Sequence, residues 1–114
     1  MKLPEAGVLL RIVVGEADTY KGKPIYEQIV VKARELNLAG ATVVRGIMGF
    51  GGSSRIHTAK ILRLSEDLPV VIEIADTEER VSAILPVRDE VLRGGIVTLE
   101  SVRVLHYRHT GDAR

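Results

Sequence analysis

The segment GVLLRIVV, residues 7–14, decides the fold class of this chain. It is apolar and rich in β-branched side chains, a composition that favours a β-strand. Side chains alternate across a strand, so the two predicted faces carry Leu10, Ile12 and Val14 on one side and Leu9, Arg11 and Val13 on the other. Both faces are mainly apolar, and we therefore expect this strand to be covered on both sides.

Two helices are predicted after this strand. Pro24 suits a first helical position, and apolar residues at near-helical spacing predict a helix over residues 24–37. The second helix is predicted to begin at a cap formed by Asp76, with Glu79 completing a capping-box pair. We expect this helix to kink or break at Pro86 and to end at Gly94-Gly95.

Three further strands are predicted at residues 41–47, 70–75 and 96–107. In the last of them, the apolar residues change from one face of the strand to the other, which predicts a bulge, or a division into two short strands, near Glu100-Ser101. The resulting order β-α-β-β-α-β predicts an α+β, ferredoxin-like sandwich formed by a single domain, residues 1–114. Its four-stranded antiparallel sheet carries both helices on one face.

The opposite sheet face is also mainly apolar in the first three strands, and no helix remains to cover it. Another copy of the chain is the expected cover, so we predict a homo-oligomer. Arg11, Arg45 and Glu73 are isolated charges in these strands, and they could pair across the contact or at its edge. The alternative is a monomer whose strand twist and loops cover the face.

Composition limits the possible functions. Sixteen Lys and Arg against fifteen Asp and Glu give a net charge of +1, so no overall field attracts nucleic acid, and no nucleic-acid partner is expected. Cysteine is absent, which excludes disulfides and thiolate metal sites and suits a reducing compartment. The first residues lack the apolar run of a signal peptide, and we expect a cytoplasmic protein.

The segment GIMGFGGSSRIHTAK, residues 46–60, is the main candidate for function. About twenty residues separate Met48 from Leu68, and connections of that length in compact domains are usually functional or disordered. Glycines allow the backbone to approach a ligand closely and to present N–H groups to an anion. The segment lacks the spacing of a phosphate-binding loop, a dinucleotide fingerprint or a nucleophile elbow. A loop in which glycine and serine merely avoid strain is the simpler alternative.

A family resemblance rests on three motifs in their order along the chain: ATVVRGIMGFG at 41–51, His57-Thr58, and LPVVIEI at 68–74. Together they resemble the PII nitrogen-regulatory signalling family, and more closely its PII-like branch catalogued as a domain of unknown function. The resemblance implies a non-enzymatic homotrimer that binds an adenine nucleotide, ADP, ATP or AMP, in the clefts between subunits. It also implies that a flexible loop, residues 48–68, acts on an unidentified protein target such as a membrane transporter or channel.

The resemblance also implies the site residues. The nucleotide-binding set on one side of the cleft is Thr42, Gly49, Phe50, Gly51 and Glu73, and the set from the neighbouring subunit is Arg93, Gly94, Gly95, Arg103, Arg108 and His109. The family's lysine in the loop after the second helix is missing, and Arg93, Arg103 or Arg108 could replace it. The partner-contacting loop residues are Gly52, Ser53, Ser54, Arg55, His57 and Lys60. No tyrosine lies between Gly51 and Leu68, so covalent nucleotidylation is not expected, and no catalytic or metal-binding residue is predicted.

Other functions fit the same fold, because a fold alone does not set function. The chain could be a trimeric scaffold without a ligand, or a metal-responsive protein that uses His57, His106 and His109. An RNA-binding module has the same strand order, but only Phe50 and three tyrosines are available to stack on bases. An acylphosphatase-type enzyme would use Arg11 and the glycine-rich loop, although no base or nucleophile is identified.

Overall fold

The structure, a computed structural model, describes residues 6–49, 57–58, 68–92 and 94–107. The elements in chain order are β1 (Ala6–Gly15), β2 (Thr19–Tyr20), β3 (Lys23–Pro24), α1 (Ile25–Glu35), β4 (Thr42–Arg45), β5 (Met48–Gly49), β6 (His57–Thr58), β7 (Pro69–Asp76), α2 (Glu78–Ser82), α3 (Pro86–Glu90) and β8 (Ile96–Arg103). The predicted alternation of long strands and helices is therefore confirmed.

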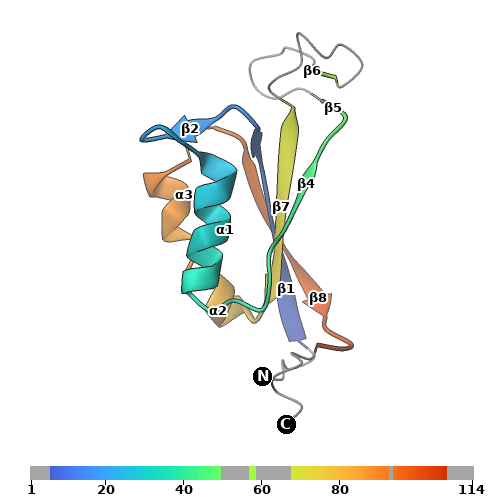
Figure 1. Ribbon diagram of the computed structural model, residues 1–114. Helices are drawn as coiled ribbons and strands as arrows, with labels where there is room; N and C mark the ends of the chain where they lie inside the picture. The colour runs from blue at the N-terminus through green and yellow to red at the C-terminus, as the bar shows by residue number, and fades with distance from the viewer. Residues whose placement is uncertain (1–5, 50–56, 59–67, 93, 108–114) are drawn as a thin grey trace.

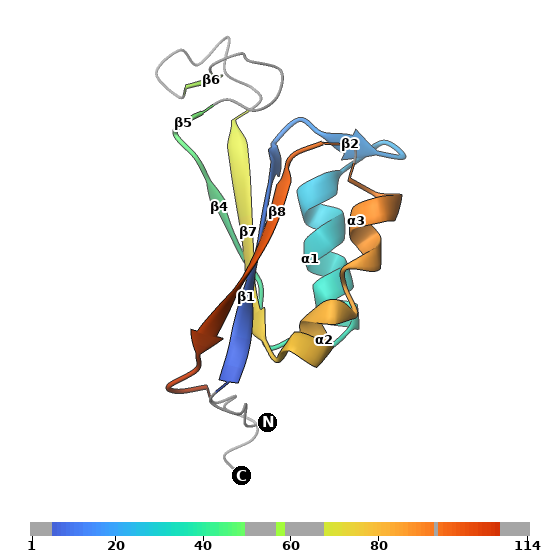
Figure 2. The same ribbon diagram turned by 180° about the vertical axis from the view of Figure 1, so that it is seen from behind.

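The four-stranded sheet has the order β4-β7-β1-β8, and each neighbouring pair is antiparallel. Strands β1 and β4 are joined through α1 but separated in the sheet by β7, and β7 and β8 are separated in the same way by β1. This is the split arrangement expected for a ferredoxin-like fold. All three helices lie on one face of the sheet (Figures 1 and 2).

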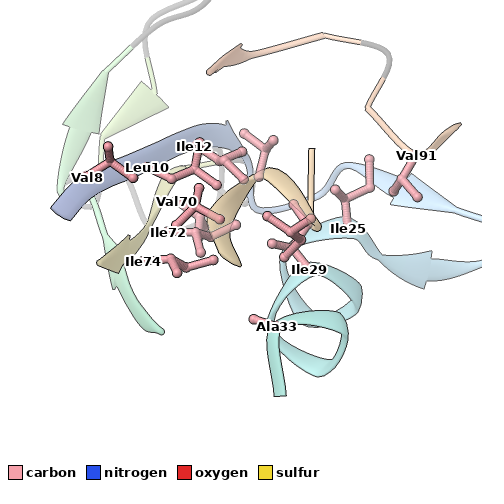
Figure 3. Close-up of a cluster of buried hydrophobic side chains, with 13 residues drawn as sticks. Val8, Leu10, Ile12, Ile25, Ile29, Ala33, Val70, Ile72, Ile74 and Val91 are labelled. Atoms are coloured by element: carbon pink, nitrogen blue, oxygen red, sulfur yellow. The ribbon is translucent and has the colours of Figure 1, made fainter. Parts of the chain in front are cut away.

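The hydrophobic core lies between the central strands and the helices (Figure 3). Strand β1 alternates as predicted, with every second side chain buried from Val8 to Val14. Helix α1 contributes Ile25, Ile29 and Ala33, which recur once per turn on its inner face. Each large apolar side chain buried here contributes roughly 1.5–3 kcal/mol, so the core is the main source of stability.

The second helix differs from the prediction at its start. Asp76 is the last residue of β7 and is fully buried, because strand alternation turns it toward the core. Its Oδ2 accepts a hydrogen bond from the Ala39 N–H at 2.8 Å, so its carboxylate binds the backbone of the segment that connects α1 to β4. Thr77 caps the helix instead, with its Oγ1 accepting from the Arg80 N–H at 3.2 Å. The predicted Asp76–Glu79 capping box is wrong.

The predicted break at Pro86 is confirmed, because α2 and α3 are separate helices and Pro86 occupies the first turn of α3. The predicted end at Gly94-Gly95 is wrong, since α3 ends at Glu90. Gly95 has a φ of +87°, and a Cβ there would lie 2.2 Å from the Val13 carbonyl oxygen. This glycine therefore allows the chain to enter β8 against β1 rather than capping a helix.

Strand β8 has no bulge. Its ladder with β1 pairs residues one to one from Val13 and Ile96 to Ala6 and Arg103, so both predicted alternatives at residues 100–101, a bulge or two short strands, are wrong. The apolar phase shifts because β8 is an edge strand that the helices cover poorly, and Leu99 on its helix-facing side is 44% exposed. The strand also ends at Arg103 rather than 107, where β1 offers no further partner among the described residues.

Other element boundaries also differ from the prediction. Helix α1 begins at Ile25 with Pro24 as its N-cap residue and ends at Glu35, and β4 is limited to Thr42–Arg45. The ladder of β4 with β7 stops near Pro69, which has no N–H to donate. Two short hairpins add to the predicted elements, β2 with β3 and, within the long connection, β5 with β6.

Candidate functional site

The sheet face opposite the helices, called the open face below, carries a polar row beside an apolar row. The polar row crosses the sheet as Thr42, Glu73, Arg11 and Thr98, which are directly paired on adjacent strands. Arg11 donates two hydrogen bonds to Glu73 Oε2, from Nε at 2.9 Å and from Nη2 at 2.8 Å. Its Nη1 lies 3.7 Å from Glu100 Oε1. Two of the predicted isolated charges thus pair within one subunit.

The adjacent apolar row consists of Val44, Val71, Val13 and Ile96, again paired strand by strand. Its two ends are the most exposed, with Val44 49% and Ile96 58% accessible. A continuous apolar row of this kind on a sheet face usually marks a contact surface. The open face therefore combines apolar area with a half-exposed ion pair at its centre.

The start of the long connection packs on Pro69. The Gly46 N–H donates to the Pro69 carbonyl oxygen at 2.7 Å, and Met48–Gly49 pairs with His57–Thr58. A Cβ at Gly46 or Gly49 would lie 2.7 or 2.9 Å from the Pro69 ring, which is too close for any other residue to fit without displacement. Contact with a proline ring is thus a reason for glycine at these two positions that was not predicted from the sequence.

The predicted site residues fall on opposite edges of the sheet. Gly49 follows the edge strand β4, whereas Gly94 and Gly95 precede the other edge strand, β8. Both positions lie at the same end of the sheet, because Gly46 pairs with Pro69 and Gly95 contacts Val13 near the end of β1. Three strand spacings separate the two edges, about 14 Å. One subunit alone does not close these segments around a common ligand.

The remaining predicted residues are placed as follows. Thr42 and Glu73 are direct partners on the open face, and Glu73 is held by Arg11. Arg103 ends β8, about 23 Å along the strand from Ile96, so it belongs to the opposite end of the sheet. His57 lies in β6, opposite Gly49. Outside the described residues are Phe50, Gly51, Gly52, Ser53, Ser54, Arg55, Lys60, Arg93, Arg108 and His109.

Several contacts that join distant segments were not predicted from the sequence. Glu16 and Arg45 form an ion pair with Nη2 and Oε1 2.9 Å apart, and the Tyr107 hydroxyl donates to the Ala39 carbonyl oxygen at 3.0 Å. Residues 19–24 form a hairpin in which Lys21 and Gly22 both have positive φ. Gly22, which directly follows the β-prone pair Thr19-Tyr20 and Lys21, was the available signal for the turn of that hairpin.

Within the described residues, no three His, Cys, Asp or Glu side chains form a group that could hold a metal ion. None of the helices in the described part of the chain has the length and apolar character needed to cross a membrane.

Solved structures show to which class this fold belongs. CPII, a nitrogen regulatory PII-like protein from Thiomonas intermedia K12 whose structure contains ADP and bicarbonate, matches with a TM-score of 0.67 and 20% identity, over 90% of this chain and 95% of that one. The divalent ion tolerance protein CutA1 from Ehrlichia chaffeensis matches with a TM-score of 0.54 and 14% identity, over 95% of this chain and 87% of that one. The fold is thus PII-like.

Within that class, residues 7–104 match the model of the family DUF190, described as "Uncharacterized ACR", and the chain belongs to this family. A UPF0166 protein from Aquifex aeolicus (strain VF5) is 41% identical over 101 residues, which are 86% of this chain and 92% of the relative. The UPF0166 protein of Methanocaldococcus jannaschii is 34% identical over 97 residues, 84% and 89% of the two chains. The predicted resemblance to an uncharacterised PII-like branch is confirmed.

Proposed function

We propose that this protein is a non-enzymatic cytoplasmic regulator that assembles as a homotrimer and binds an adenine nucleotide between subunits. The observation that carries the proposal is the position of the glycine-bearing segments on opposite edges of one sheet, at the same end. Head-to-tail assembly around an axis places the β4 edge of one subunit beside the β8 edge of the next. Each closed contact then forms one complete cleft.

Two further observations support assembly. The open face exposes Val44 and Ile96, which lie in a row that continues across all four strands. Within the described part of the chain, β4 and β8 are the edge strands of the sheet, and backbone groups at such edges favour pairing with another chain. The Arg11–Glu73 pair lies in the middle of this face, where it would become more buried on assembly and would oppose contacts in a wrong register.

Nucleotide binding in the cleft is supported by the chemistry of the segments that border it. A Cβ placed on Gly94 would meet no atom within 4 Å, so the backbone at this glycine is open to a ligand. Backbone N–H groups of glycine-rich turns bind phosphate oxygens well. The PII-like CPII protein of the same fold was solved with ADP and, in another structure, with ADP and AMP, which makes an adenosine phosphate the first ligand to test.

The regulatory output is proposed to pass through the connection over residues 48–68 to a protein target, by a change in that segment between nucleotide-bound and nucleotide-free states. Isothermal titration calorimetry with ADP, ATP and AMP tests the binding step. We expect saturable binding of at least one nucleotide, with one site per subunit. Heats of dilution only, for all three nucleotides at millimolar concentration, would contradict the proposal.

Assembly and binding are tested together by sedimentation velocity with and without the nucleotide that binds. A trimer in both conditions is expected. If the chain sediments as a monomer and still binds nucleotide with a stoichiometry of one, the intersubunit cleft is the wrong location for the site.

A further inference from the structure

Glu16 contacts both ends of the long connection between β4 and β7. Its backbone N–H donates to the Leu68 carbonyl oxygen at 2.8 Å, just where the chain returns to the sheet. Its side-chain Oε1 accepts from Arg45, the last residue of β4, with Nε at 3.1 Å and Nη2 at 2.9 Å. One residue of the β1–β2 turn therefore joins the two points where this connection leaves and re-enters the sheet.

The turn that carries Glu16 is itself fixed on both sides. Gly15 donates its N–H to Asp18 Oδ2 at 2.8 Å, and Asp18 donates its own N–H to the Gly15 carbonyl oxygen at 3.1 Å. The Asp18 carbonyl oxygen accepts from the Ile25 N–H at 2.9 Å, which ties the turn to the first residue of α1. Glu16 is thus held relative to both the sheet and the helix layer.

The following hairpin is anchored to the same helix. The Gln28 side-chain amide donates to the carbonyl oxygens of Tyr20 and Lys23, both at 2.9 Å. Figure 1 shows this hairpin, labelled β2, at the same end of the molecule as β5 and β6. The β1–β2 turn and the hairpin after it are therefore hydrogen bonded to α1 on one side and, through Glu16, to the ends of the long connection on the other.

The other side of that base is set by Pro69. Gly46 hydrogen bonds to the Pro69 carbonyl oxygen, and both Gly46 and Gly49 pack against its ring. Leu68, the residue whose carbonyl Glu16 binds, is only 1% exposed. The first residues of the connection, from Gly46 to Gly49, thus directly follow the Arg45–Glu16 contact in the chain, and both end glycines pack on the Pro69 ring.

The Glu16–Arg45 ion pair contributes little to global stability. The Arg45 side chain is 58% exposed and that of Glu16 28%, and solvent-exposed pairs typically contribute only about 0–1 kcal/mol. Its geometry is more informative, since two guanidinium nitrogens converge on one carboxylate oxygen. Such a contact restrains direction at the end of β4 even where its net energy is small.

We propose that Glu16 is a positioning residue that fixes the direction in which the chain leaves β4, and so places Gly46–Gly49 at the proposed cleft. Its effect on nucleotide affinity rests on the proposed function, whereas its effect on the chain at Gly46 does not. Glu16 acts through Arg45 and Leu68 and is not itself assigned a contact with the ligand.

The test uses the full-length protein with Glu16→Gln, Glu16→Arg, Arg45→Glu and the exchanged pair Glu16→Arg/Arg45→Glu. Each variant keeps the backbone N–H of residue 16, so the bond to Leu68 remains and only the side-chain contact changes. The matched control is Glu35→Gln. It makes the same chemical change at the last residue of α1, whereas the turn that carries Glu16 is tied to the first residue of that helix. The readouts are amide hydrogen exchange at Gly46, ADP affinity by calorimetry, and Tm.

We expect the amide hydrogen of Gly46 to exchange roughly three- to fivefold faster in Glu16→Gln than in the wild type. A factor of this size is what the loss of a largely exposed ion pair can produce. The two single charge reversals should show larger increases, and the exchanged pair should return within about twofold of the wild type, because it restores the opposite charges. ADP affinity should fall in parallel, by about three- to fivefold in Glu16→Gln. Tm should change by less than about 3 °C in Glu16→Gln, and Glu35→Gln should match the wild type in every readout.

Unchanged exchange at Gly46 in both single charge reversals, or failure of the exchanged pair to restore it, overturns the proposal. A fall in Tm that accounts for all of the faster exchange also overturns it, because the role would then be general stability. If the wild type binds no adenine nucleotide while exchange at Gly46 follows the expected pattern, the positioning role stands and the proposed function fails.

Discussion

Replacing Ile96 with aspartate tests the assembly face most directly. Ile96 lies at the β8 end of the apolar row on the open face, opposite Val13, and 58% of its surface is accessible. Full burial of such a side chain contributes about 1.5–3 kcal/mol, so covering the exposed 58% contributes about 1–1.7 kcal/mol per copy. Three copies in a trimer give about 3–5 kcal/mol, before any cost of burying three carboxylates.

That energy corresponds to a loss of at least about a hundredfold in the association constant, since each 1.4 kcal/mol is a factor of about ten. Sedimentation equilibrium over a range of concentrations measures it, and circular dichroism checks that the subunit stays folded. If the wild type forms the proposed trimer, Ile96→Asp should dissociate at concentrations where the wild type stays assembled, with its far-ultraviolet spectrum unchanged.

The matched control is Val31→Asp, because Val31 has a similar exposure, 54%, but lies on the outer side of α1. This variant should remain assembled. The reasoning is refuted if Ile96→Asp retains the wild-type association constant, or if Val31→Asp dissociates to the same extent while remaining folded.

Three further substitutions test the corrected local structure, each by thermal or urea denaturation. Gly95→Ala should destabilise the folded protein by at least about 1 kcal/mol, because the residue has positive φ and its new Cβ would meet the Val13 carbonyl oxygen. An unchanged unfolding midpoint would show that the backbone at this position is free to relax. Thr77→Ala should cost about 1 kcal/mol as the loss of a helix cap, and a neutral result would argue against Thr77 as the capping residue. Tyr107→Phe should cost about 0.5–1.5 kcal/mol by removing the hydrogen bond to the Ala39 carbonyl, and no change in stability would mean that water replaces this contact without loss.

The open face was predictable because its evidence is local. Alternation along residues 7–14 assigned Leu10 and Ile12 to one side and Leu9 and Val13 to the other, and the structure buries the first pair in the core. A side chain's face follows from the period of the strand, which is two residues whatever the partner strand is. The order of helices and strands was predictable for a similar reason.

The candidate site was only partly predictable. Motif resemblance named Gly49, Gly94 and Gly95, but the chain sequence does not contain the spacing between β4 and β8. The sequence also could not show that Pro69 requires glycine at positions 46 and 49. About twenty residues of chain separate Gly49 from Pro69, and the contact forms only in the folded chain. Such contacts depend on strand pairing between segments that are distant in the chain.

The sequence alone determined the order of the long strands and helices, the buried face of β1 and α1, and the family to which the chain belongs. Tertiary structure decided the role of Asp76, the uninterrupted register of β8 and the bridge formed by Glu16. The physical reason is that periodicity and propensity act between residues a few positions apart, so they can be seen in the sequence. Whether a carboxylate caps its own helix, supports another connection or joins two ends of a loop depends on which donors the folded chain brings within about 3 Å of it.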